Sequence, residues 1–222
     1  MIGDERIPEG DAPVKRRGRK AVTPSGPQPS WPGDPEQLEA TNVDFAAIAH
    51  VLANTCRWSG RARRFLSLAQ HALAVSEEIE ALDGIPDADR RAVALHALLG
   101  NARAAWLGDD DGTDPASAKA TTRARTHGER IDRAVREAAG LSPEPPEEWG
   151  ELLRLVVRMT DAAERRDLGV GAGAPFPPSR RTVRPMPPEQ AAERWLDRFR
   201  QLAGHPGGGD GKSAIPGSGE SA

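Results

Sequence analysis

The sequence is poor in aromatic residues and has a single cysteine. It contains no Tyr, four Phe and five Trp, so its core must be built mainly from Ala, Leu and Val. One cysteine, Cys56, excludes an intramolecular disulfide framework and is typical of a reducing compartment. No apolar run approaches the ~20 residues of a membrane span, and the N-terminus lacks the apolar segment of a signal peptide. These absences favour a soluble cytoplasmic protein that does not contact a membrane.

The charge and length favour one domain with two tails. A net charge of -3 over 222 residues argues against nucleic acid as a partner of the whole chain. The segment Lys15–Lys20 is basic and could touch nucleic acid or acidic lipids, although a solvated tail explains it more simply. We expect disordered tails at 1–33 and 204–222, which are rich in Pro, Gly, Ser or charge and cannot bury enough apolar surface to fold. The domain is expected at 34–203.

Between the tails, apolar residues recur at helical spacing throughout. This pattern predicts an all-α bundle of about six helices, at 44–55, 63–82, 87–106, 117–139, 147–168 and 188–202. Thr41 and Asp44 have the spacing of a capping box before the first helix. Phe65 and Leu155 are expected on the inward stripes of the second and fifth helices.

Four short segments carry the strongest signal, and they occur in a fixed order. They read DFAAIAHVLA (44–53), CRWSG (56–60), FLSLAQH (65–71) and ALLGNARAAWLGD (97–109). Together they resemble segments of bacterial and phage 5′-nucleotidase-like hydrolases in the HD-domain phosphohydrolase superfamily. Those proteins read D-I-A-H-x-L-S, C-R-F-x-G, F-Y-S-V-A-x-H and A-L-L-H-D-A-x-E-A-Y-L-G-D. The resemblance covers roughly residues 34–203 and implies an HD-domain helical bundle.

The resemblance also implies a metal site that has lost its central residues. HD domains bind a divalent metal with an early His, a His-Asp pair and a distant Asp, and the metal activates a water for attack on phosphorus. His71 matches the early His. Gly100 and Asn101 stand where the His-Asp pair belongs, and Ala104 stands where a catalytic Glu belongs. No catalytic residue of the family therefore remains at these positions.

Each of these residues also has a structural interpretation. His71 lies between apolar residues three before and four after it, so its ring should point into the bundle as a ligand or as a packed core residue. Gly100 would then mark close helix packing, and Asn101 keeps a carbonyl oxygen without the charge of Asp. His96 lies about one turn, ~6 Å, before Gly100, which is too far for it to replace the lost His.

The position of the distant Asp has two interpretations. Asp161 in the segment RMTD resembles it. However, residues 163–168, AERRDL, resemble the family segment x-E-x-R-D-L and lie about one turn too close to Asp161. Either a turn has been deleted after Asp161, or an apolar residue near Val157 occupies the position. An Asp on an exposed helix flank is the structural alternative for Asp161.

The substrate-facing positions are better preserved. By the resemblance, Arg57, Trp58 and Asp109 match residues that approach the phosphate and the sugar. The planar guanidinium of Arg suits phosphate because it donates two hydrogen bonds at once. The structural alternative is a turn in which Trp58 fills the core. Residues 110–111 extend Asp109 into an acidic run that a solvated loop also explains, and Lys119 loosely matches a phosphate-side lysine.

Three interpretations of function follow. The favoured one is a degenerate, catalytically inactive HD phosphohydrolase-like protein with vestigial metal positions at His71, Asn101 and Asp161. It would need no cofactor, would keep a cleft for a nucleotide or another phosphate-bearing small molecule, and could form a homodimer. The second is an active hydrolase using Mn, Co, Mg or Fe, with a site rebuilt from these three residues and one of residues 109–111. The third is a helical protein-interaction module that binds through its basic tail or through Pro175–Pro188.

Overall fold

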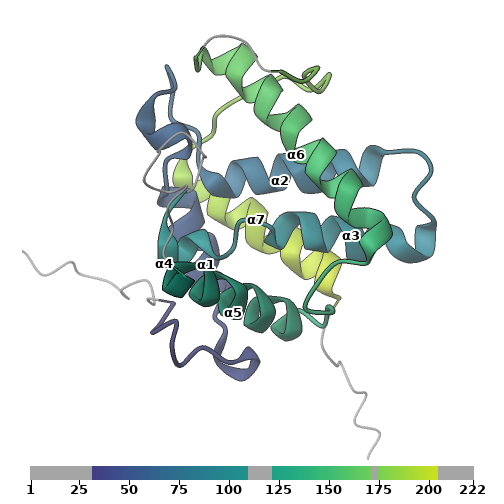
Figure 1. The fold of residues 1–222 in the computed structure, drawn as a ribbon. Coiled ribbons are helices and arrows are strands. Elements are labelled where there is room, and N and C mark those ends of the chain that lie inside the picture. The colour runs from purple at the N-terminus through teal and green to yellow at the C-terminus, as the bar shows by residue number, and fades with distance from the viewer. Residues whose placement is uncertain (1–31, 110–121, 172–174, 205–222) are drawn as a thin grey trace, which may run out of the picture.

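The computed structural model describes residues 32–109, 122–171 and 175–204 (Figure 1). These residues fold into helices and loops without a strand, which confirms the all-α prediction. The α-helices are α1 (Phe45–Asn54), α2 (Leu68–Ala81), α3 (Asp87–Leu99), α4 (Ala104–Leu107), α5 (Thr122–Ala138), α6 (Glu147–Leu168) and α7 (Pro188–Ala203), and the 3₁₀ turns are η1 (Ala40–Asn42) and η2 (Arg57–Gly60).

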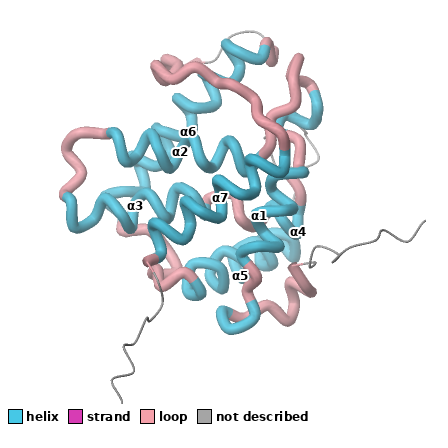
Figure 2. The backbone as a smooth tube through the Cα atoms, turned by 180° about the vertical axis from the view of Figure 1, so that it is seen from behind, coloured by secondary structure: helices cyan, strands magenta, loops and turns pink. Residues whose placement is uncertain are grey.

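The helix pair α2–α3 lies at the centre of the bundle. In Figure 1, α6 crosses in front of α2, and Figure 2 shows α7 running across the opposite side. Helix α1 packs on α7, where the rings of Phe45 and Phe199 stack with centroids 3.9 Å apart. Small Ala residues and Leu fill most of the core, as the composition predicts, and Trp195 is completely buried within it. Helix α2 is therefore covered on two sides, and polar residues along it lie in the interior.

Two predicted helix starts need correction. Helix α2 begins at Leu68 rather than at residue 63, because the Ser67 side chain caps it by accepting a 3.2 Å bond from Gln70 N. The preceding residues form a turn, in which Phe65 is 39% exposed instead of pointing inward. Helix α1 is capped by Asp44 itself, whose carboxylate accepts from two backbone N–H groups. The capping box predicted from Thr41 is therefore wrong.

The predicted helix 87–106 is broken in the structure. Helix α3 ends at Leu99, and residues 100–103 continue as turns with backbone bonds of the 3₁₀ type before the single turn of α4. The fifth prediction, 147–168, agrees with α6, but Leu155 on that helix is 44% exposed rather than buried. The limits of α6 were predicted at both ends, and the predicted helix 188–202 differs from α7 by one residue.

The connection from α6 to α7 returns along α2 and is fixed by side chains of the bundle. The Gln70 amide donates a 2.6 Å bond to the carbonyl oxygen of Arg184 and accepts a 3.0 Å bond from Met186 N. The Asp167 carboxylate accepts a 2.8 Å bond from Val183 N. The path of this loop is therefore set by backbone bonds to α2 and α6.

Several sequence predictions lie outside the described residues. These are most of the two tails, the basic segment at 15–20, the acidic residues 110–111 and Lys119. Among the helices that the structure does describe, none has both the length and the apolar character needed to cross a bilayer.

Candidate functional site

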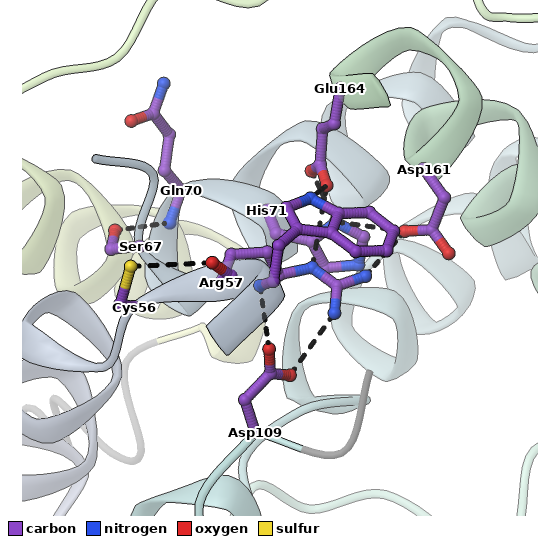
Figure 3. A network of polar contacts seen from close by, with 9 residues as sticks. Cys56, Arg57, Ser67, Gln70, His71, Asp109, Asp161 and Glu164 are labelled. Carbon is purple, nitrogen blue, oxygen red and sulfur yellow. Dashed lines mark hydrogen bonds and ion pairs between the residues drawn. The ribbon is translucent and has the colours of Figure 1, made fainter. Parts of the chain in front are cut away.

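A buried ionic network joins the turn after α1 to helix α6. Its centre is the guanidinium of Arg57, a residue that is 4% exposed (Figure 3). Nη1 lies 3.2 Å from Oδ1 of Asp109, and Nη2 donates a 2.6 Å bond to Oδ1 of Asp161. Nε lies 3.5 Å from Oε2 of Glu164. One buried cation is therefore surrounded by three carboxylates, and we call these residues, with Trp58 and His71, the Arg57 network.

His71 enters this network from α2. It is 1% exposed, which confirms that its ring points into the bundle. Its Nδ1 lies 2.6 Å from Oε1 of Glu164 and 3.8 Å from Oδ1 of Asp161. Its Nε2 is buried and has no hydrogen-bond partner among the described residues. The two residues that resemble the early His and the distant Asp of the family are thus brought close together.

Trp58 fills the core beside the network. The residue is 1% exposed, and its indole Nε1 donates a 3.1 Å bond to Oε2 of Glu164. The guanidinium carbons of Arg57 and Arg165 lie 4.6 and 4.1 Å from the indole ring centroid. Its backbone is in the left-handed region at φ 60°, which is rare for a residue with a side chain, and its N–H bonds Asp109. In this structure Trp58 packs in the interior and offers no exposed wall to a ligand.

Neighbouring charges determine the ionisation of the network. Burial disfavours the charged form of Arg57, but Glu164, Asp161 and Asp109 outweigh it and raise the pKa of the guanidinium. Burial would raise the pKa of Glu164, yet the charge of His71, the hydrogen bond from its ring and the charge of Arg57 hold that pKa below its ordinary value. Both groups therefore stay ionised at neutral pH.

The network contains three residues of the kind that bind metals. One ligand atom from each of His71, Asp161 and Glu164 lies within 4.8 Å of the others. However, the 2.6 Å separation of His71 and Glu164 is that of a direct hydrogen bond. Two ligands of one ion, each ~2.0–2.2 Å from it, would lie ~3 Å or more apart. Arg57 also supplies the positive charge that these carboxylates need. As arranged, the residues do not fit a divalent metal.

Gly100 and Asn101 line a cavity between α3, α5 and α6. We call it the His96 cavity; it measures about 390 Å³. Its lining residues are His96, Ala97, Gly100, Asn101, Arg136, Pro145, Gly150, Leu153, Arg154, Val157 and Arg158. No member of the Arg57 network is among them. The cavity that Asn101 lines therefore includes neither His71 nor Asp161.

The residues that line the cavity distinguish the positions of Val157 and Asp161, the two candidates for the distant Asp. Val157 lines the cavity together with Gly100 and Asn101, whereas Asp161 lies about one turn further along α6 and binds Arg57. A Cβ built on Gly100 would approach only the carbonyl oxygens of Ala97, at 3.3 Å, and His96, at 3.7 Å, among the described residues. Close helix packing at Gly100 is therefore wrong, and the space beside it is open. Ala104 is buried at 7% exposure.

Glu164 is the residue of the network that sequence reasoning missed. It lies three residues after Asp161, so both carboxylates face the same side of α6. Its segment, AERRDL, resembles a family segment, but that resemblance gives Glu164 no role. The signal that could have found it is this pair of acidic residues at helical spacing, together with a buried Arg and His elsewhere in the chain.

Comparison with known proteins places the chain in a family. The chain is 31% identical over 178 residues to the uncharacterized protein YfdR of Escherichia coli (strain K12). The aligned region covers 76% of this chain and 89% of YfdR. The chain belongs to the YfdR family. No family model matches the sequence. Because nearly the whole of YfdR is covered, the relationship extends over the helical bundle and is not limited to one motif.

Proposed function

We propose that this member of the YfdR family is a degenerate, cytoplasmic HD phosphohydrolase-like protein that does not hydrolyse phosphate esters. The observation that carries the proposal is the closed state of Arg57. By resemblance this residue faces the substrate phosphate, but here its guanidinium nitrogens face the carboxylates of Asp109, Asp161 and Glu164. A phosphate would have to displace carboxylates of its own charge sign from a buried guanidinium. This arrangement favours a structural role for Arg57.

The His96 cavity supports the same proposal. If Val157 is the counterpart of the distant Asp, the three replaced metal positions, Gly100, Asn101 and Val157, lie around one cavity. Among the described residues, no Asp or Glu lines it. A hard divalent cation needs anionic oxygen ligands, and neutral amide oxygen is a poor substitute. The cavity therefore keeps the space of a metal site without its charge.

An active hydrolase is the second candidate, because His71, Asp161 and Glu164 cluster within 4.8 Å. The metal ligands of this hydrolase would be His71, Asp161 and Glu164. The site predicted from the sequence had Asn101 and one of residues 109–111 in place of Glu164. The hydrolase would require the Arg57 network to open so that a metal could replace the direct bond between His71 and Glu164. The two candidates differ in one measurable property, the release of phosphate.

Phosphate release by the purified full chain tests the proposal directly. With a panel of nucleoside monophosphates and Mn²⁺, Co²⁺ or Mg²⁺, we expect no release above the blank. Metal-dependent release that is lost in His71→Ala and kept in His50→Ala would establish the hydrolase instead. His50 is a suitable control because it is exposed on α1, away from the network.

A gain-of-function variant tests the assignment of the lost metal positions. Gly100→His, Asn101→Asp and Val157→Asp, with Ala104→Glu, should allow one divalent ion to bind per chain, measured by elemental analysis after dialysis. The matched control carries Leu155→Asp in place of Val157→Asp, because Leu155 is exposed on the same helix. Equal metal content in both variants, or none in either, would count against the assignment.

A further inference from the structure

Arginines gather at one end of the molecule, where the turn before α2, the end of α6 and the loop to α7 lie together (Figure 1 and Figure 2). Residues 61–66, 165–171 and 175–187 contain eight arginines, no lysine and a single acidic residue, Asp167. The net charge of -3 is an average over the whole chain and hides this local excess of positive charge. Such a cluster is the electrostatic footprint of a surface that binds a polyanion.

Hydrogen bonds to main-chain atoms hold these three segments together. The N–H of Arg63 donates a 3.0 Å bond to the carbonyl oxygen of Leu168 at the end of α6. The guanidinium of Arg166 donates bonds of 3.1 and 2.8 Å to the carbonyl oxygens of Ser179 and Arg181 in the loop. The segments are therefore fixed relative to one another before any ligand binds, which lowers the entropic cost of binding.

Most of these arginines lack an acidic partner. Arg166 pairs with Asp167, and Arg181 pairs with Glu77 and Glu78. Five others have no carboxylate within ion-pair distance among the described residues, and they are Arg63, Arg64, Arg165, Arg180 and Arg184. Four of the five are exposed, and Arg165 is half-buried over the ring of Trp58. We call these five residues, with Phe65, the Arg63 surface.

The residue types of the Arg63 surface distinguish between kinds of polyanion. A planar guanidinium donates two hydrogen bonds to one phosphate and also stacks on flat rings, which an ammonium group does not. Phe65 follows Arg64 directly and is 39% exposed, so its ring can stack on an unpaired base. The surface consists of a turn, a helix end and a loop, so it offers neither a helix for the major groove of a duplex nor an amphipathic helix for a lipid layer. These features favour a single strand.

We infer that the Arg63 surface binds single-stranded nucleic acid, either RNA or DNA. Its arginines contact successive phosphates, and Phe65 stacks on a base. Phosphate contacts and stacking do not read base identity, so the binding is expected to depend little on sequence. The inference does not depend on the proposed function, because no residue of the Arg57 network belongs to this surface.

Fluorescence anisotropy of labelled strands of about 12 nucleotides tests the inference with the full chain. The probes are oligo(U) and oligo(dT), and the tighter of the two identifies the preferred sugar. We expect binding whose affinity falls steeply between about 50 and 200 mM NaCl. The competitors, matched in charge, are the unlabelled strand, a DNA duplex, a polyglutamate peptide and phosphatidylserine vesicles. No binding of either strand, or stronger competition by any of the last three than by the unlabelled strand, would overturn the inference.

A charge variant and a matched control locate the binding. The variant changes to Gln the four exposed arginines of the surface, Arg63, Arg64, Arg180 and Arg184. The control makes the same change in net charge at exposed arginines of α5, α6 and α7, namely Arg133, Arg154, Arg158 and Arg200. We expect the variant to weaken binding about tenfold or more, and to reduce the slope of log affinity against log salt by about 0.7 for each lost phosphate contact. Equal affinities in the two proteins would show that only net charge matters and would refute the assigned surface.

Two further variants separate stacking and the basic tail from these arginines. Phe65→Ala should weaken single-strand binding about tenfold and leave the salt slope unchanged, because stacking involves no charge. Leu155→Ala is its control, since Leu155 is a similarly exposed apolar residue on α6. Neutralisation of the basic residues at 15–20 should leave most of the affinity in place. Binding that is abolished by this tail variant and retained by the four-arginine variant would place the site in the tail and overturn the inference.

Discussion

His71 and Glu164 are hydrogen-bonded inside the bundle, with Nδ1 2.6 Å from Oε1 and both side chains at most 2% exposed. The bond joins the first turn of α2 to the last part of α6. The other carboxylate oxygen of Glu164 accepts the indole N–H of Trp58. A single carboxylate therefore connects two helices with the turn at η2, and it satisfies polar atoms that would otherwise be buried without partners.

Replacement of this carboxylate should destabilise the fold. Removal of one partner from a buried ionic pair typically costs ~3–5 kcal/mol, because the remaining charge stays buried. We expect Glu164→Gln to lower the free energy of unfolding by about 3 kcal/mol in guanidinium denaturation. Glu151→Gln, at an 88% exposed side chain on the same helix, should change it by less than ~0.5 kcal/mol.

The pH dependence of this effect has a defined sign. The folded-state pKa of Glu164 is below its ordinary value of 4.5. The ionised carboxylate therefore contributes to the free energy of unfolding above pH 4.5, and this contribution is lost as the pH falls through the folded-state pKa. The stability difference between Glu164→Gln and the unchanged protein should therefore shrink in acid. A difference that stays constant from pH 7 to pH 3 would contradict the ionised state of Glu164.

Histidine 96 should make the protein sensitive to mild acid. Its pKa is lowered from 6.5 to about 4 on folding. The neutral ring therefore makes its full contribution to the free energy of unfolding above pH 6.5, and this contribution is lost as the pH falls towards 4. The change corresponds to on the order of 3 kcal/mol. We expect His96→Leu to flatten the fall in unfolding free energy between pH 6.5 and 4. The exposed His50→Gln should keep the full slope, and identical slopes in the two variants would refute the buried neutral state of His96.

Alanine at position 100 should stabilise the protein. Gly100 has φ -56° and ψ -28°, which Ala adopts freely, and the nearest atoms to an added Cβ belong to the preceding turn of the same chain. Since Ala loses less backbone entropy than Gly on folding, Gly100→Ala should add up to ~1 kcal/mol to the free energy of unfolding. Gly84→Ala should act in the opposite direction, because φ at Gly84 is +89°. Thermal denaturation of both variants gives the comparison, and a loss of stability at position 100 would show that the cavity wall tolerates no added atom.

Local sequence signals predicted the helices best where local structure decides their ends. Helix α6 was predicted at its observed limits, and Gly169 ends it in the left-handed conformation that favours glycine. The start of α2 was missed although Ser67 and Gln70 form a local cap, because the apolar stripe of the helix already begins at Phe65. The break after Leu99 was missed because the apolar pattern continues through it into α4.

The candidate site shows the same division between local and distant effects. Family resemblance identified Arg57, His71 and Asp161 as site residues, and the structure brings them together. The family resemblance did not predict that three carboxylates would neutralise Arg57. That outcome depends on how α6 is rotated against α2. That Asn101 lines a cavity without His71 likewise depends on helix packing, which no segment of the sequence encodes alone.

The loop between α6 and α7 has a consequence for how this family can diverge. Gln70 and Asp167 bond only main-chain atoms of that loop, at Arg184, Met186 and Val183. Every residue except proline presents the same main-chain N–H, and every residue presents the same carbonyl oxygen. Substitutions of Val183, Arg184 and Met186 by residues other than proline can therefore leave these three bonds in place, whereas the side chain of Arg181 on the same loop pairs with Glu77 and Glu78 and also holds the loop to α2.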